Sequence, residues 1–276
     1  MTGKSRIMAW GGRVIGSDTI VTALQAADEN EKVAAIVLRV NSPGGSALAS
    51  DLIWREIQRI EKPIIASMGD VAASGGYYIS MGCDQIFAEP GTITGSIGVV
   101  GGKLAIGKML DRIGVTHDVL SRGKNSGILS SNEPFSDSER NAWKEFMTGI
   151  YEQFTSKAAA GRKMELSKLL KVAGGRIWTG NQALEKGLVD ELGTLEAAIS
   201  AARKSAGIPR DEKVDYLILP EPKTFFEQMI EDASVHSPVT RLFPQFGRFA
   251  GDLEVFGKTL ERYPAALALP YSITIK

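Results

Sequence analysis

The alternation of apolar and polar positions divides the first part of the chain into short elements in a regular order. Residues 33–40 and 64–68 are continuous apolar runs, which are typical of strands covered on both faces. Residues 47–60 lie between them and carry apolar side chains at helical spacing. A capped amphipathic helix over residues 20–27 precedes the first strand. This order of strand, helix and strand predicts right-handed βαβ units, and hence an α/β fold with a parallel sheet.

The pattern continues less regularly beyond residue 84. Residues 85–88 predict a short strand, and residues 92–100 alternate β-branched residues with glycine. A helix over 103–113 and a strand over 115–120 precede a polar loop over 121–134. Further helices are expected over 136–160, 165–172, 181–187 and 195–206, and a further strand over 214–219.

A change of composition near residue 208 predicts the domain boundary. Residues 1–207 form the expected domain, and residues 208–276 form a C-terminal extension with too few strands for a sheet of its own. We expect this extension to pack on the domain or on a neighbouring subunit. The chain enters ordered-looking sequence within a few residues of Met1, which indicates a fragment of a longer protein.

Composition excludes several classes of function. The 32 basic and 32 acidic residues cancel, so no global charge favours nucleic acid as a partner. The single cysteine, Cys83, excludes an internal disulfide and a multi-thiolate metal site, and we expect a buried structural thiol. No cofactor and no metal site are expected. No apolar run forms a signal peptide or is long enough to span a bilayer.

The candidate chemistry centres on Ser74, which lies between small residues where a strand is expected to give way to a helix. Small neighbours let backbone and substrate approach closely, and a helix N-terminus offers unpaired N–H groups to a developing oxyanion. The arrangement therefore suits an exposed nucleophile. The structural alternative is a tight turn whose serine only caps the helix.

A second glycine-rich turn, over residues 41–46, follows the preceding strand. In a parallel sheet both turns open at the same carboxyl edge, where functional sites collect. One turn can then present the nucleophile while the other presents a backbone N–H to the oxyanion. Neither turn has the glycine spacing of a phosphate-binding loop.

A serine nucleophile needs a general base. The only histidines are His117 and His236, and we expect both to be structural or solvated. A lysine desolvated until its amine is neutral is the base in Ser-Lys enzymes.

Several motifs together resemble the SppA (signal peptide peptidase A, protease IV) family of the ClpP/crotonase superfamily. The resemblance covers about residues 14–205, and its motifs lie at 41–46, 72–77, 94–99, 175–183 and 187–193. It implies a repeated β-β-α superhelix with a parallel sheet and a helical C-terminal region. It also implies that Ser74 is the nucleophile, that the N–H groups of Gly45 and Gly75 form the oxyanion hole, and that Ser96 orients the catalytic lysine.

The lysine departs from the family pattern. Ser126 occupies the position at which single-domain members carry the base, and Lys124 lies two residues earlier. Lys124 is therefore the candidate base of this chain, with a solvated loop lysine as the alternative. In two-domain members the N-terminal half supplies the lysine, and this chain resembles the serine-bearing C-terminal half.

The resemblance implies a serine endopeptidase that degrades cleaved signal peptides or other unfolded peptides at the cell envelope, as a homo-oligomer. A peptide would add as a strand in a groove lined by Ile93, Thr94, Gly95 and Ile97. One alternative is a serine-bearing half that is inactive without a lysine from a partner. Another is a crotonase-type acyl-CoA enzyme, which shares the fold but has no use for Ser74.

Overall fold

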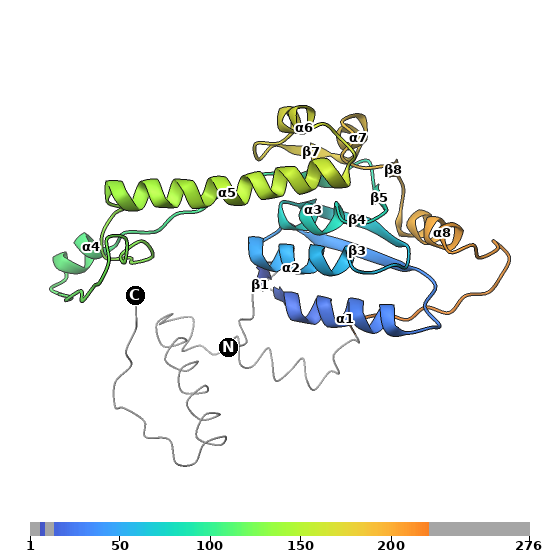
Figure 1. The fold of residues 1–276 in the computed structure, drawn as a ribbon, viewed down its shortest axis with the longest axis horizontal. Helices are drawn as coiled ribbons and strands as arrows, with labels where there is room; N and C mark the ends of the chain where they lie inside the picture. Colours follow the sequence, from blue (N-terminus) through green and yellow to red (C-terminus); the bar gives the residue numbers. More distant parts are fainter. Residues whose placement is uncertain (1–5, 9–13, 221–276) are drawn as a thin grey trace, which may run out of the picture. The chain divides into compact units, whose positions relative to one another are not determined.

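The computed structural model describes residues 6–8 and 14–220, which belong to one compact unit ending at Pro220 (Figure 1). Its main sheet contains β3 (Ile36–Ser42), β4 (Ile64–Ala73), β5 (Gln85–Ala88), β6 (Ile93–Gly95), β7 (Ile177–Thr179) and β8 (Glu191–Leu192). β1 (Arg6–Met8) and β2 (Val14–Gly16) form a separate antiparallel pair. The helices are α1 (Ser17–Glu29), α2 (Ala47–Ile57), α3 (Gly75–Ser80), α4 (Gly107–Arg112), α5 (Asp137–Gly161), α6 (Leu166–Val172), α7 (Gly180–Glu185) and α8 (Leu195–Ser205).

The main sheet has the order β7-β6-β4-β5-β8, and β3 also pairs with β4. Every pair is parallel except β6–β7, which is antiparallel. The predicted α/β class with a parallel sheet is therefore confirmed.

The two faces of β4 pack against different helices, as alternation along a strand requires. Ile64, Ala66 and Met68 belong to the large core cluster that includes buried residues of α2 and α3. Ile65 points to the other face, where it packs with Phe87 and with two alanines of α8. Both faces of β4 are thus covered, which accounts for its nearly continuous apolar sequence.

β4 changes partners half-way along its length. Residues 65–67 pair with β5, whereas residues 71–73 pair with β6. The register with β3 shifts over the same stretch, because Val40 pairs with Met68 but Ser42 pairs with Ala72. This irregularity bends the strand before it reaches Ser74.

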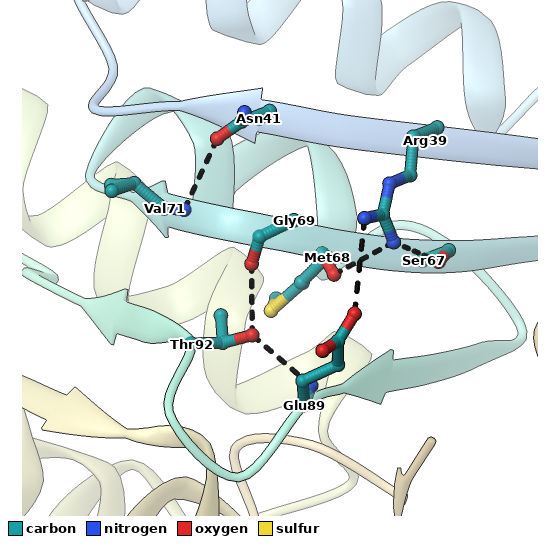
Figure 2. A network of polar contacts seen from close by, with 8 residues as sticks. All are labelled: Arg39, Asn41, Ser67, Met68, Gly69, Val71, Glu89 and Thr92. Atoms are coloured by element: carbon teal, nitrogen blue, oxygen red, sulfur yellow. Dashed lines mark hydrogen bonds and ion pairs between the residues drawn. The ribbon is translucent and has the colours of Figure 1, made fainter. Parts of the chain in front are cut away.

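Side chains hold the bend in place (Figure 2). The Thr92 hydroxyl donates to the Gly69 carbonyl at 2.8 Å and accepts the Glu89 N–H at 3.0 Å. Asn41 Oδ1 accepts the Val71 N–H at 3.1 Å. Backbone groups that the shifted register leaves without a ladder partner are therefore satisfied by neighbouring strands and loops.

Some predicted elements are wrong. Residues 115–120 and 214–219 form no strand, although both runs carry β-branched and apolar residues. Tyr216 and Ile218 are exposed to 67% and 70%, and no strand of the described chain pairs with either run. The short strands β7 and β8 were not predicted. Residues 221–276, most of the predicted extension, and His236 with them, lie outside the described residues.

The side chain of Lys157 links α5 to α2 and α3. The Lys157 ammonium pairs with Asp51 and lies 4.0 Å from the centroid of the Trp54 ring. The Tyr78 hydroxyl donates to the same carboxylate at 2.7 Å. Burial and this hydrogen bond raise the pKa of the Tyr78 phenol, so it remains a donor.

We expect Lys157→Met to lower the free energy of unfolding by about 1–2 kcal/mol, because it removes both the ion pair and the cation–π contact. Urea unfolding followed by circular dichroism measures the change. Lys144→Met, on an exposed part of the same helix, is the matched control. Equal midpoints for the two variants would show that the cluster contributes nothing to stability.

Candidate active site

Ser74 lies at the junction between β4 and α3, as the small residues around it predicted. Its backbone has φ 52° and ψ −116°, a conformation that costs a non-glycine residue energy and persists only where its surroundings impose it. The Ser74 N–H donates to the Gly95 carbonyl at 2.9 Å, and its carbonyl accepts the Tyr78 N–H at 2.8 Å. Its side chain makes no hydrogen bond within the described residues. The helix-capping alternative therefore finds no support, because α3 has no side-chain cap hydrogen bond.

The second glycine-rich turn meets the first at the carboxyl edge of the sheet. Gly44 has φ 97°, and a Cβ on it would lie 2.5 Å from the Gly75 nitrogen and 2.9 Å from Ser74 Cβ. A Cβ on Gly75 would lie 3.3 Å from the Gly45 nitrogen. The Gly45 and Gly75 amides are thus close neighbours beside Ser74, and neither has a hydrogen-bond partner among the described residues. Two such donors suit a developing oxyanion.

Ser96 follows the neighbouring strand. Gly95 pairs with Ala73, so Ser96 and Ser74 begin at adjacent strand ends, about 4.8 Å apart by the usual strand spacing. Ser96 also has a positive φ, 51°, and its N–H donates to the Arg176 carbonyl at 2.7 Å. Its half-buried side chain therefore starts beside Ser74.

The residues expected to line a substrate groove lie mostly inside the sheet. β6 pairs with β4 on one side and with β7 on the other, so it has no free edge for an added peptide. Thr94 and Ile97 are fully buried, Gly95 is buried, and the Thr94 hydroxyl donates to the Ala72 carbonyl at 2.7 Å. Only Ile93 is exposed, to 44%.

An unpaired segment follows Ser96. Residues 98–105 make no backbone hydrogen bond to any described residue. Val100 and Leu104 within it are exposed to 98% and 76%. Within the described chain, the unpaired backbone groups nearest to β6 therefore lie in residues 98–105, after the four residues named from the sequence.

Lys124 is exposed, and its loop and α3 contact opposite ends of α5. Its loop contacts the first turn of α5, because Lys103 Nζ donates to the Gly127 carbonyl at 3.0 Å and pairs with Glu139 at 3.8 Å. The other end of α5 reaches α3, where Phe154 lies 4.6 Å from the Tyr78 ring. Glu139 and Phe154 are separated by about 22 Å along the helix axis. Figure 1 shows α4 and its loops at the end of α5 remote from α3.

One residue that contacts the site, Arg176, was not predicted from the sequence. The Arg176 carbonyl, which holds the Ser96 N–H, belongs to the turn before β7. In the sequence this stretch stood out only as part of a family motif, because a strand of three residues is too short to show an alternation of apolar and polar positions.

A strained serine beside two free amides, at the edge of a parallel sheet, defines a candidate hydrolase site of the serine-nucleophile class. Residues 56–209 match the family model described as peptidase family S49, and residues 4–92 match that of Clp protease. The chain therefore belongs to peptidase family S49.

Known relatives agree with this assignment. The chain is 42% identical over 216 residues to "Serine protease SPPA, chloroplastic" of Arabidopsis thaliana, covering 77% of this chain and 32% of that protein. It is 37% identical to the protein slr0021 of Synechocystis sp., covering 82% of each. It is 38% identical to "Protease 4" of Haemophilus influenzae, covering 72% of this chain and 33% of that protein. The chain thus spans about a third of two of these relatives.

Among solved structures, a ClpP1 mutant from Listeria monocytogenes has a TM-score of 0.48 at 14% identity, over 66% of this chain and 86% of that chain. Within the described residues, no helix combines the length and the apolar character that crossing a bilayer requires.

Proposed function

We propose that this chain hydrolyses peptide bonds by a Ser-Lys mechanism in which Ser74 is the nucleophile. The observation that carries the proposal is the strained Ser74 backbone beside the Gly45 and Gly75 amides, which have no hydrogen-bond partner among the described residues. Ser74 Oγ attacks the peptide carbonyl, and a neutral lysine amine accepts its proton. The amides stabilise the oxyanion, the C–N bond breaks, and the lysine protonates the leaving amine. Water then hydrolyses the acyl-enzyme.

We place the general base outside the copy that carries the serine. Lys124 is the candidate lysine. Ser96 would orient an amine beside Ser74, but the Lys124 loop of the same copy lies at the far end of α5, so another copy must supply the amine. A second copy of the chain can deliver that loop in a head-to-tail assembly. The region around α4 suits such a contact, since Ile113, Leu120 and Leu129 are exposed to 68%, 95% and 74%.

The substrates we propose are unfolded peptides, including cleaved signal peptides, bound in an extended conformation. Residues 98–105 offer unpaired backbone groups directly after Ser96, which suits the addition of a peptide strand. An envelope location stays a prediction from the family. Membership of a peptidase family argues against the acyl-CoA alternative.

Mixing two inactive variants tests the source of the base. We expect Ser74→Ala and Lys124→Ala each to lose peptidase activity, and a refolded equimolar mixture to regain about a quarter of it, because each site combines residues of two copies. Labelling of Ser74 by a fluorophosphonate probe is the second readout. Lys204→Ala, an exposed lysine on α8, is the matched control and should keep full activity.

Each other outcome has a defined meaning. If wild type is active and the mixture stays inactive, a base within the same copy serves each serine. If wild type is folded but unlabelled, the lysine must come from another domain, as expected for a serine-bearing half.

A further inference from the structure

We infer that the turn over residues 174–176, together with Trp178, is a positioning element that fixes the Ser96 backbone relative to the Ser74 backbone. This inference rests on the proposed roles of those two serines. It assigns a function to a segment that follows Ser96 by more than 75 residues in sequence. This segment contacts the site through backbone atoms and the indole ring of Trp178.

Two hydrogen bonds clamp the chain on either side of Ser96. The Ser96 N–H donates to the Arg176 carbonyl at 2.7 Å, and the Gly175 N–H donates to the Ile97 carbonyl at 2.9 Å. A Cβ on Gly98 would lie 2.8 Å from Gly175 Cα, so the two segments are in direct backbone contact. These contacts impose the positive φ of Ser96, which a serine does not favour by itself.

Trp178 supports the residue that joins the two serines. A Cβ on Gly95 would lie 2.8 Å from Trp178 Cδ1, so the indole packs directly on the Gly95 backbone. The Gly95 carbonyl accepts the Ser74 N–H at 2.9 Å. The indole is itself fixed, because its N–H donates to the Val172 carbonyl at 3.0 Å and Lys186 Nζ lies 4.3 Å from the ring centroid. Displacement of the turn would therefore move both serines.

The turn depends on glycine at a position that can be tested cleanly. Gly175 has φ 74°, and a Cβ on it would meet nothing within 4 Å. Gly175→Ala therefore changes the preferred backbone conformation without adding a clash. Gly207 provides a matched control, because it has φ 71° and is equally open but follows α8, outside the site.

The experiment compares the rate of fluorophosphonate labelling at Ser74 with the melting temperature. We expect Gly175→Ala to label roughly 10- to 100-fold more slowly than wild type, since small displacements of reacting groups cost this much. Gly207→Ala should label at the wild-type rate with a similar loss of melting temperature. Gly175→Asn should recover most of the rate, because asparagine tolerates positive φ. The pH dependence of labelling should also change in Gly175→Ala, since Ser96 would orient the base.

Equal labelling rates for Gly175→Ala and Gly207→Ala would overturn the inference. If Gly175→Ala does not fold, Trp178→Phe keeps a ring on Gly95 but removes the indole donor, and unchanged labelling in that variant overturns it equally. Failure of the proposed function gives a different result, namely wild-type protein labelled at a residue other than Ser74.

Discussion

Ser74→Ala is expected to abolish fluorophosphonate labelling and to reduce peptide hydrolysis by about 10⁴-fold or more, the usual cost of removing a serine nucleophile. The variant should remain folded, because the Ser74 side chain makes no hydrogen bond within the described residues. Alanine must adopt the same positive φ, so the free energy of unfolding should change by less than about 1 kcal/mol. Intact-mass spectrometry after labelling and thermal unfolding measure the two effects.

Ser205→Ala is the matched control, because Ser205 is an exposed residue at the end of α8, outside the Lys124 loop and the Ser74 site. It should label at the wild-type rate. Persistent labelling in Ser74→Ala, mapped to another residue, would remove Ser74 from the mechanism.

Gly44→Ala is expected to have the second-largest effect, although it adds a single methyl group. Its Cβ would lie 2.5 Å from the Gly75 nitrogen and 3.1 Å from the Ala73 carbonyl oxygen, and the residue has φ 97°. The two turns must therefore separate, which displaces the Gly45 and Gly75 amides from their common position. We expect labelling to fall about 10²- to 10³-fold, as when an oxyanion donor is removed. The free energy of unfolding should fall by about 2–3 kcal/mol.

Gly91→Ala controls for the substitution itself, because a Cβ on Gly91 meets nothing within 4 Å. It should keep both the labelling rate and the stability. A Gly44→Ala protein that labels like wild type would show that the close contact between the turns is not needed for acylation.

The position of Ser74 and its surroundings could be predicted because each signal there was local. A run of small residues ends an apolar strand and begins a helix, so Ser74 could be placed at the junction from its neighbours alone. The parallel order of β3 and β4 then put the Gly44–Gly45 turn at the same edge. The positive φ values of Ser74 and Ser96 were not predictable, because contacts made by distant residues such as Gly95 and Arg176 impose them.

The wrong strand predictions and the remoteness of Lys124 from Ser74 within one copy both depend on long-range partners. Residues 115–120 have the composition of a strand, but β propensity needs a neighbouring strand, and none of the described chain lies beside them. The position of Lys124 along the sequence matched the family within two residues, yet sequence offset carries no information about its distance from Ser74. The length and direction of α5 determine that distance.

The change of pairing partner along β4 divides the domain into two halves with different roles. One half, in which β4 pairs with β5 and packs on α8, has no catalytic group within the described residues. The other half, in which β4 pairs with β6, ends at Ser74. Because the bend lies between the two halves, the strained backbone at Ser74 need not distort the hydrogen bonds between β4 and β5. Substitutions in β6, β7 and the segment after Ser96 can therefore change the surroundings of Ser74, while the β5 and α8 half keeps the protein folded.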